Sequence, residues 1–402
     1  SGIYVRARDV MLDSDLSAAA WWAKYPYLGA TEAEAGTNRP KAVMFMFQNW
    51  VMAVPNNQKN IDAINKMELV ICCDTHLSET AQMADYIIPG SHALERYDYN
   101  SNWVTHYSLS LRQPVVSSWI GNPYRFEAGV LMELATRMGL AGGAGSTSPG
   151  NFSMTYEQFL GQELLGDSTL KASLHPTGDL TNMADCDTAL NNFKALPGAY
   201  WPSPTALAAN IASWGTKYGT KSMLMQGSAE KIVLNSASIY DNGVAGTGIT
   251  GYKSLQTAGY DALPKYADPE ASPANNPGYP FHLVNWKQVE HTHSRTFNNV
   301  WLMEMKGHNP LYINTATAAS LGIVDGDAIK VESPYATVDA TAFVTEGIEP
   351  STVGMLHGFG HTALGEVAKG KGTSDGVLPS GKAEAISGQA IHKETAVKVY
   401  KA

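Results

Sequence analysis

Side chains suited to binding a polar ligand are concentrated in one short stretch of the C-terminal third. His293, Ser294, Arg295, Thr296 and Asn299 bring imidazole, hydroxyl, guanidinium and amide groups together. An arginine with hydroxyl and amide neighbours is suited to gripping phosphate and the polar edges of heterocycles. The same composition is also typical of a solvated loop, so both interpretations stay open. A zinc site at His291 and His293 is poorly supported, because no further cysteine or carboxylate is spaced to complete it.

A second such stretch follows an apolar run at residues 353–356. Its sequence is His357-Gly358-Phe359-Gly360-His361. The glycines allow the backbone to approach a ligand closely, and the histidines can donate hydrogen bonds. The alternative is a glycine-rich turn whose histidines face solvent.

Asp74 follows the apolar residues 69–73, which are typical of a strand buried on both faces of a parallel sheet. In open α/β sheets, ligands bind outside the carboxyl ends of the strands. Asp74 and Thr75 are therefore candidate binding residues. Asp74 is equally suited to cap the next short helix, which the residues Ser78, Glu79 and Thr80 open.

Other chemistries are poorly supported. No Gly-x-Ser-x-Gly sequence exists to position a nucleophilic serine. Three cysteines are too few for a disulfide framework and include no four-cysteine iron–sulfur spacing. We expect Cys72 and Cys73, adjacent in a strand, to be small core side chains.

The predicted elements indicate two fold types. Strands at residues 41–47 and 69–73, with a helix at 58–67 between them, predict a parallel, Rossmann-like sheet. There is no glycine-rich dinucleotide fingerprint, so ordinary NAD binding is poorly supported. After residue 279, short strands separated by turns predict a β-barrel. We expect those strands at residues 281–284, 311–313, 328–332, 337–344, 353–356 and 396–400, with one helix at 316–321.

Four segments follow from these patterns. Residues 1–40 are expected to be an irregular connecting segment, and 41–145 the Rossmann-like cofactor-binding domain. Residues 146–275 are expected to form a helical insertion or lid that returns to the core, and 276–402 the β-barrel. Smaller predicted elements are a strand at 112–116, a strand at 230–234, and helices at 124–138, 155–165 and 205–214.

Composition limits the function classes. The formal net charge of −9 argues against a nucleic-acid partner, which would need a basic face. No apolar run approaches the ~20 residues of a membrane span, and the first residues do not form a signal peptide. If the protein is exported, we expect the signal to lie upstream or on a partner.

Taken in order, the motifs resemble the C-terminal half of a molybdopterin oxidoreductase of the dimethyl sulfoxide reductase family. The similarity covers nearly all of residues 40–140 and 228–400. The matching blocks are Asn49 with Val54-Pro55-Asn56, Asp74-Thr75, Glu79-Thr80-Ala81, Ala84-Asp85, Ile88-Pro89, Leu94-Glu95-Arg96, residues 259–264, His293-Ser294-Arg295-Thr296, residues 319–323, Asp325-Gly326-Asp327 and residues 357–361.

Within the family, the sequence is most similar to polysulfide and thiosulfate reductase catalytic subunits. The supporting blocks are residues 78–81, residues 94–98, Thr373-Ser374-Asp375, Ile386-Ser387-Gly388 and His392. Respiratory arsenate reductases share much of this pattern and form the alternative. A non-catalytic structural subunit of a respiratory complex is the alternative from another class.

The resemblance implies a double-psi barrel and a set of cofactor-binding residues. Asp74 would accept hydrogen bonds from guanine, with Thr75 and Asn49 beside it; Ser294, Arg295 and Thr296 would contact the pterin-pyrophosphate; His357, Phe359 and His361 would lie near the other cofactor arm. The full implied set is Asn49, Asp74, Thr75, Glu79, Thr80, His293, Ser294, Arg295, Thr296, Asn299, His357, Phe359, His361 and His392. No catalytic residue and no protein ligand to the metal can be assigned.

The resemblance also implies the cofactor and the partners. The cofactor would be bis-molybdopterin guanine dinucleotide with molybdenum or tungsten, and an iron–sulfur cluster would lie outside this chain. Expected partners are the N-terminal half of the catalytic subunit (in another chain or a missing segment), an iron–sulfur electron-transfer subunit, a membrane-anchor subunit and a small inorganic substrate. The expected location is extracytoplasmic, on the periplasmic side, with membrane association through the partners.

Overall fold

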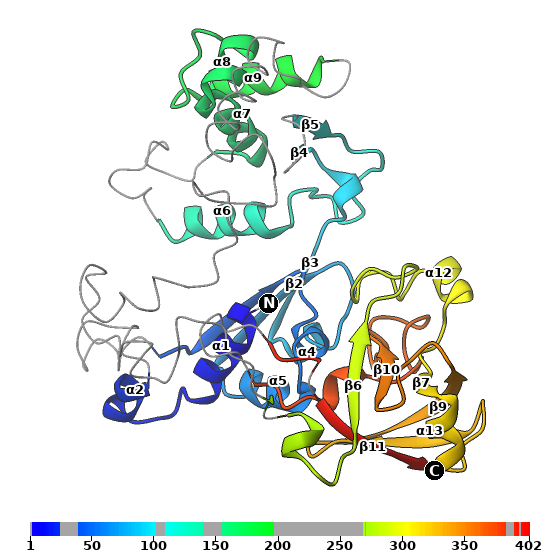
Figure 1. Cartoon of the computed structure of the whole chain (residues 1–402). Coiled ribbons are helices and arrows are strands. Elements are labelled where there is room, and N and C mark those ends of the chain that lie inside the picture. The colour runs from blue at the N-terminus through cyan, green and yellow to red at the C-terminus, as the bar shows by residue number, and fades with distance from the viewer. Residues whose placement is uncertain are drawn as a thin grey trace, which may run out of the picture. The chain divides into compact units, whose positions relative to one another are not determined.

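The computed structural model describes most of the chain, which divides into two compact units (Figure 1). The described residues are 2–24, 39–101, 109–139, 154–196, 268–269, 271–382, 390–393 and 395–402. One unit comprises Ser1–Ile88 and Ser236–Ala402, and the other is Pro89–Asn235. Four predicted segments lie outside the described residues: the helix at 205–214, the strand at 230–234 and the blocks at 259–264 and 386–388. The predicted domain boundaries stay predictions.

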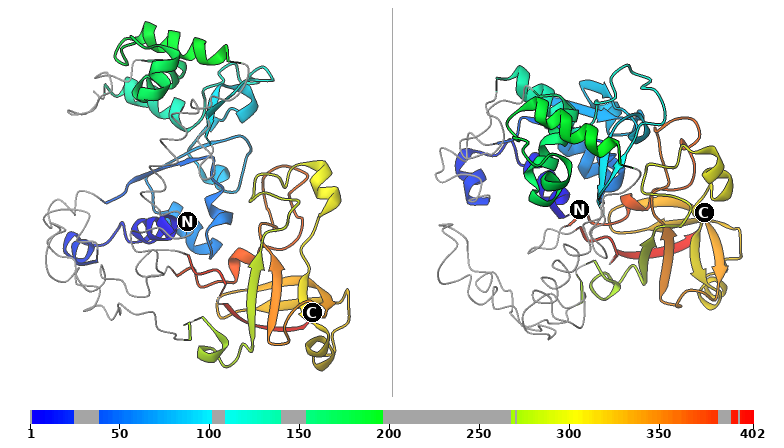
Figure 2. Two further views of the ribbon diagram at one scale, coloured as in Figure 1. Left: turned by 45° about the horizontal axis from the view of Figure 1, so that its top comes forward. Right: turned by 90° about the horizontal axis from the view of Figure 1, so that it is seen from above.

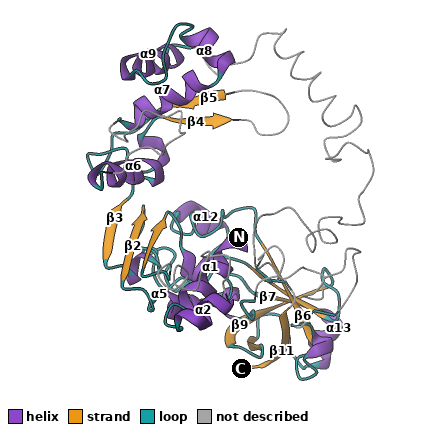
Figure 3. Cartoon of the chain, turned by 90° about the vertical axis from the view of Figure 1, so that its left-hand side faces the viewer, coloured by secondary structure: helices purple, strands orange, loops and turns teal. Residues whose placement is uncertain are grey.

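The first unit contains a small sheet of three strands in the order β1-β2-β3 (β2 and β3 are labelled in Figure 3). The strands are β1 (Ala42–Met46), β2 (Leu69–Asp74) and β3 (Tyr86–Pro89). β1 and β2 are parallel, as the sequence predicted, with Ala42 opposite Leu69 and Met46 opposite Cys73.

Two helices, α4 (Trp50–Ala53) and α5 (Asn57–Ile64), connect β1 to β2. The start of α5 is fixed by Asn56, which has a positive φ of 65° and accepts a hydrogen bond from the amide of Lys59 through its side chain. Trp50 and Ile64 pack with Phe45 and Cys72 in the core beside the sheet. The buried Cys72 and Cys73 confirm their predicted role as core side chains.

The expectation that residues 1–40 are irregular is wrong for their described part. Helices α1 (Gly2–Leu12) and α2 (Ala18–Lys24) lie there. The guanidinium of Arg8 is 1% exposed and donates to the carbonyl of Pro55 at 2.9 Å and to the carbonyl of Gly381. A buried arginine with distant carbonyl partners ties α1 to the unit, and these long-range contacts leave no local sequence pattern.

The C-terminal part of the first unit is a closed six-stranded barrel with the order β10-β6-β11-β8-β9-β7 (Figure 2). Its strands are β6 (Phe281–Trp286), β7 (Leu311–Asn314), β8 (Ala328–Glu332), β9 (Thr337–Thr345), β10 (Thr352–Leu356) and β11 (Thr395–Lys401). Two pairs, β10 with β6 and β7 with β9, are parallel, and the others are antiparallel. The barrel prediction is confirmed.

Helix α12 (Val300–Met305) follows β6, and α13 (Thr315–Ser320) follows β7. The barrel interior is filled by aliphatic side chains from all six strands, so it is a packed core. Chemistry must therefore take place at the ends of the strands and in the loops that leave them.

The second unit combines a hairpin with helices. Strands β4 (Asp98–Ser101) and β5 (Leu109–Arg112) are antiparallel. The helices are α6 (Glu127–Arg137), α7 (Tyr156–Gly166), α8 (Ser168–Leu174) and α9 (Met183–Lys194). The predicted strand at 112–116 is wrong, since β5 ends at Arg112. The nearby Pro114 has no N–H to continue a ladder.

Gly161 lets α7 approach α9 closely, because a Cβ at this position would collide with the carbonyl of Cys186.

The described residues contain no helix with both the length and the apolar character needed to cross a membrane.

Candidate functional site

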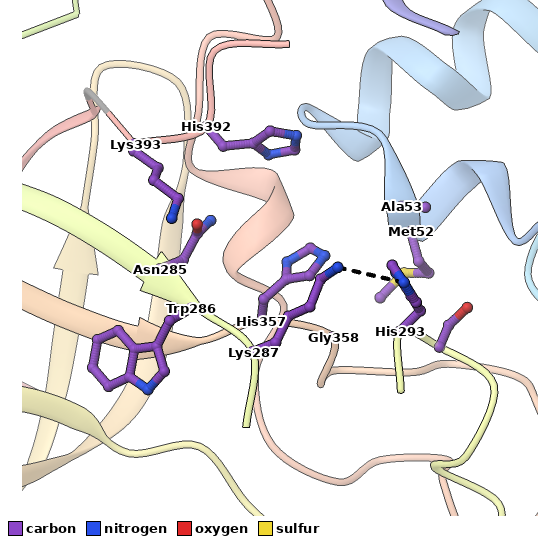
Figure 4. Close-up of a pocket in the computed structure, with 11 residues that line it drawn as sticks. Met52, Ala53, Asn285, Trp286, Lys287, His293, His357, Gly358, His392 and Lys393 are labelled. Atoms are coloured by element: carbon purple, nitrogen blue, oxygen red, sulfur yellow. Dashed lines mark hydrogen bonds between the residues drawn. The ribbon is translucent and has the colours of Figure 1, made fainter. Parts of the chain in front are cut away.

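A cavity of about 460 Å³ lies in the first unit, where loops from several elements meet (Figure 4). Trp286 ends β6, and His357 directly follows β10. Since β6 and β10 are parallel and Leu356 pairs with Trp286, the loops after both strands start at the same end of the barrel. The lining residues are Met52, Ala53, Asn285, Trp286, Lys287, His293, Ser294, His357, Gly358, His392 and Lys393.

The polar lining consists of cations, imidazoles and hydrogen-bond donors. Lys287 and Lys393 supply ammonium groups, and Asn285 and Ser294 supply an amide and a hydroxyl. The described lining includes no carboxylate. A cavity of this composition attracts an anionic ligand with polar edges.

The backbone of His293 has a conformation that residues other than glycine rarely adopt. Its φ is 51°, in the left-handed region, and its Nε2 lies 3.4 Å from the Nζ of Lys287. Burial, together with the charges of Lys287, Arg295 and His357, lowers the pKa of His293. Strained backbone of this kind is concentrated at binding sites.

His357 differs from the other imidazoles of the cavity, because a carboxylate lies directly behind it. Its Nδ1 is 3.0 Å from both carboxylate oxygens of Asp375, which is 2% exposed. Burial lowers the pKa of His357, but the charge and hydrogen bond of Asp375 outweigh burial and raise it. The pKa of His392, whose ring centroid is 6.2 Å from that of His357, is lowered by burial and by the charge of His357.

Two glycines allow the loop after β10 to pack tightly. Gly358 has a φ of +101°, and a Cβ there would come within 3.0 Å of the Phe297 ring. Gly360 has a φ of +81°, and a Cβ there would collide with the backbone nitrogen of Ser374. Glycine at these positions brings His357 close to both neighbouring loops.

A second group of predicted residues forms a buried hydrogen-bond network. The carboxylate of Glu79 accepts from the amides of Thr362 (2.7 Å) and Ala363 (2.9 Å). It also accepts from the Nδ2 of Asn49 (2.6 Å), and the Nδ1 of His361 lies 3.1 Å away. The network connects the loop after β2 to the loop after β10.

Thr80 belongs to the same hydrogen-bond network. Its hydroxyl accepts from the amide of Val51 at 2.9 Å and donates to the Oδ1 of Asn49 at 3.2 Å. Burial raises the pKa of Glu79, but hydrogen bonds from His361, Ala363 and Asn49 and the charge of His361 lower it to about 2. The structure thus gives Asn49, Glu79, Thr80 and His361 internal partners, and their predicted contact with the cofactor stays a prediction.

Asp74 and Thr75 lie at the carboxyl end of β2, as predicted. One carboxylate oxygen of Asp74 accepts from the amide of Thr75 at 2.7 Å, and the other accepts from the hydroxyl of Ser78 at 3.0 Å. Asp74 is only half-buried. Its two hydrogen bonds order the turn after β2, and its carboxylate remains accessible at the strand end. The alternative raised from the sequence, that Asp74 caps the next short helix, is wrong, because the N-cap residue of that helix (Ala81–Met83) is Thr80.

The structure also shows the surroundings of the other predicted residues, Arg295, Thr296, Asn299 and Phe359. Arg295 is exposed, and the hydroxyl of Thr296 accepts from the amide of Thr292 at 2.9 Å. The side chain of Asn299 caps α12. Phe359 is buried in an aromatic cluster with Phe297, at a centroid distance of 4.8 Å.

His291 and His293, the two residues considered as zinc ligands from the sequence, have different surroundings. His291 is buried, stacks on Phe297 and places its Nε2 2.8 Å from the carbonyl of Lys306. Within the described ranges, no group of three or more histidine, cysteine, aspartate or glutamate side chains is arranged to hold a metal ion.

Sequence reasoning named His293, Ser294, His357 and His392 as cofactor-binding residues, and the structure brings these four into one cavity, but other lining residues were missed. Lys287, Lys393 and Asn285 line the cavity, and Asp375, which is not among the lining residues, accepts a hydrogen bond from Asn285. For Lys287, a signal was present, because it directly follows β6, and the parallel neighbour of that strand ends just before His357. For Asp375 and Lys393, no local pattern indicates the site.

Two family models match the chain in the regions just described. Residues 281–396 match the molydopterin dinucleotide binding domain, and residues 23–120 match the molybdopterin oxidoreductase family. The chain belongs to the molybdopterin oxidoreductases of the dimethyl sulfoxide reductase family. The cofactor of this family is molybdopterin guanine dinucleotide with molybdenum or tungsten.

Curated relatives include three reductase subunits. The chain is 26% identical over 339 residues to the thiosulfate reductase molybdopterin-containing subunit PhsA of Salmonella typhimurium, covering 83% of this chain and 40% of the relative. It is 25% identical over 400 residues to the menaquinone reductase molybdopterin-binding-like subunit of Nitratidesulfovibrio vulgaris, covering 98% and 45%. It is 23% identical over 370 residues to the arsenate respiratory reductase subunit ArrA of a Shewanella species, covering 85% and 41%.

The chain therefore spans less than half the length of these relatives. Among solved structures, acetylene hydratase from Pelobacter acetylenicus aligns with a TM-score of 0.58 at 20% identity, covering 90% of this chain and 44% of that one. This likeness shows the fold.

Proposed function

We propose that this chain is the cofactor-binding part of the catalytic subunit of a molybdenum or tungsten oxidoreductase. The enzyme would reduce an inorganic sulfur compound (polysulfide, thiosulfate or tetrathionate) by two electrons. The observation that carries the proposal is the cavity between the β6 and β10 loops, where Lys287, Lys393 and three imidazoles meet inside a molydopterin dinucleotide binding domain.

The residues present fit the cofactor of the family. A dinucleotide carries an anionic diphosphate and polar heterocycles, which need cations and directional donors. Lys287 and Lys393 would face the diphosphate, and Ser294, His293 and His357 would donate to its oxygens or to a heterocycle edge. When bound, the cofactor supplies the two-electron redox chemistry, while this chain binds and orients it.

Asp74 is the proposed contact for the guanine end. A carboxylate at a strand end is chemically suited to the adjacent N–H donors of guanine. We expect Asp74→Ala to lower cofactor occupancy, measured as pterin and metal per mole of purified protein. Asp62→Ala, at an exposed site on α5, is the matched control. Equal occupancy in both variants would remove Asp74 as a guanine contact.

The finer fold assignments are part of the proposal. The parallel β1–β2 pair with intervening helices supports a Rossmann-like arrangement for the sheet. The two parallel pairs within a closed six-stranded barrel support a double-psi barrel.

The proposed partners are the N-terminal half of the catalytic subunit, an iron–sulfur electron-transfer subunit and a membrane-anchor subunit, with an extracytoplasmic location on the periplasmic side. Support comes from the multisubunit reductases among the relatives, of which the chain covers 40% to 45%. Mass spectrometry of the polypeptides that co-purify with the chain tests this. Purification with no second polypeptide from a strain that makes the complete protein would count against it.

A second candidate function is a non-catalytic subunit of a respiratory complex. The menaquinone reductase subunit, whose name describes it as molybdopterin-binding-like, matches 98% of this chain, a larger share than the thiosulfate reductase subunit does. An arsenate reductase is the alternative within the enzyme class, supported by the similarity to ArrA.

Metal and pterin analysis of the purified assembly separates these candidates. Molybdenum or tungsten with pterin supports the enzyme, and their absence supports the non-catalytic subunit. A panel of thiosulfate, tetrathionate, polysulfide and arsenate, with a reduced viologen dye as electron donor, then tests the substrate. Activity on arsenate alone would overturn the sulfur assignment.

A further inference from the structure

Three histidines line the cavity, namely His293, His357 and His392, and Figure 4 shows their rings. Among these three, within the described residues, only His357 has a buried carboxylate within hydrogen-bond distance of its Nδ1. Both oxygens of Asp375 lie 3.0 Å from the Nδ1 of His357. The Oδ2 of Asp375 also accepts from the Nδ2 of Asn285 at 2.8 Å. A hydrogen bond at Nδ1 fixes the ring orientation and leaves Nε2 as the nitrogen that serves the cavity.

The position of Asp375 is fixed by residues on both sides of it. The Nδ2 of Asn57 donates to the hydroxyl of Ser374 at 3.2 Å. The amide of Asn56 donates to the carbonyl of Gly376 at 2.7 Å. Both donors lie at the start of α5, so a helix far away in sequence holds the carboxylate in place. Such support is typical of a group that orients another side chain.

The other charged groups around the ring oppose its protonation. The ionisable groups that face His357 from the elements packed around it are Lys287, His293, Asp375, His392 and Lys393. Only Asp375 among them is an anion. Without it, burial and the charge of Lys287 would favour the neutral ring.

We propose that Asp375 is a positioning residue that keeps His357 as an imidazolium, so that the cavity presents a fixed positive donor to a phosphate-type anion. The pKa of His293 and the pKa of His392 are lowered by burial and by neighbouring positive charges, so these two rings hold a proton less readily than His357 does. Asp375 touches no ligand itself and acts through His357. The identity of the anion, the diphosphate of the cofactor, rests on the proposed function, whereas the charge of His357 does not.

The test uses the full-length protein without cofactor and the variant Asp375→Asn, which keeps the shape and removes the charge. Histidine ring signals are followed by NMR as a function of pH, with His357 assigned by His357→Gln. Binding of inorganic pyrophosphate is measured by calorimetry at pH 6, 7 and 8. The matched control is Asp339→Asn, which removes an 81% exposed carboxylate on β9.

We expect His357 in the wild type to titrate above ordinary histidine, and Asp375→Asn to move its midpoint below that of ordinary histidine. Pyrophosphate affinity at pH 7 should fall by about tenfold to a hundredfold, the contribution of one hydrogen bond to a charged group. The loss should become smaller at pH 6, where His357 of the variant regains its proton. Asp339→Asn should change neither the midpoint nor the affinity.

Two results would overturn the proposal. One is a wild-type His357 that titrates below ordinary histidine, which needs no variant to fold. The other is an Asp375→Asn protein with an unchanged midpoint. Failure of the proposed function is visible separately, as absence of pterin and metal from the purified assembly, and the NMR titration decides the role of Asp375 in either case.

Discussion

Replacing Glu79 by glutamine tests whether the charge of this carboxylate holds the loop after β2 against the loop after β10 in the first unit. The carboxylate is 5% exposed and accepts from the amides of Thr362 and Ala363 and from Asn49. The substitution keeps the size of the side chain and removes its charge. Glutamine also points an N–H₂ group at a site surrounded by donors, so at least one buried donor loses its acceptor.

The magnitude follows from the depressed pKa of Glu79. The pKa falls from the ordinary value of 4.5 to about 2 in the folded protein. A difference of one unit corresponds to about 1.36 kcal/mol, so the charge contributes about 3 kcal/mol at pH 7. A depressed carboxylate pKa stabilises the fold fully above the unfolded value and loses this effect as pH falls towards the folded value. At pH 3.5 the contribution should be smaller by about 1.4 kcal/mol.

The assay is urea-induced unfolding of wild type and Glu79→Gln at pH 7 and pH 3.5. Glu366→Gln, at an exposed position in the same loop region, is the control and should differ from wild type by less than about 0.5 kcal/mol. A difference between wild type and Glu79→Gln that is the same at both pH values would refute the electrostatic reasoning. It would show that shape and packing, not charge, account for the role of Glu79.

Three further predictions concern other positions in the first unit. Thr80→Val should destabilise the fold by about 1–3 kcal/mol relative to Thr80→Ser in urea unfolding, because it removes a buried hydroxyl that both donates and accepts. Gly360→Ala should cost more stability than Gly370→Ala, since both have positive φ but only Gly360 lacks room for a Cβ; equal midpoints in thermal unfolding would contradict this. Cys72 is fully buried and its pKa is raised to about 12 by burial and by the charge of Asp74, so it should resist alkylation at pH 8 until the protein unfolds, as peptide mass mapping would show.

Local sequence patterns were sufficient for most of the first unit. Continuous apolar runs predicted β1 and β2, and the spacing of Ile61 and Ile64 predicted α5. Short strands separated by turns predicted the barrel, and all six of its strands lie within two residues of their expected bounds. These elements are predictable because each buries one continuous face or run of its own residues.

The elements that were missed depend on long-range contacts. Helix α1 is held by Arg8, whose partners Pro55 and Gly381 are far away in sequence. Glu79 was predicted as a cofactor contact because its motif resembles the family, and that contact stays a prediction. What the sequence did not indicate is that Glu79 bonds to His361, Thr362 and Ala363, which lie 282 to 284 residues later. Chemical type alone does not show whether a polar side chain serves a ligand or another loop.

The cavity and the small sheet are connected through side chains whose hydrogen-bond partners lie far away in sequence. Glu79 fastens the loop that follows His357, and Asn57 fastens the loop that carries Asp375. His357 lies four to six residues before the positions that Glu79 contacts, and its ring orientation depends on Asp375. Since both attachments come from the sheet-bearing part of the unit, a change that loosens β2 or α5 should also disturb the cavity, although neither attachment residue lines it. Weakened anion binding in Glu79→Gln would therefore reflect displacement of His357, and His357→Gln combined with Glu79→Gln should weaken pyrophosphate binding by less than the sum of the two single effects.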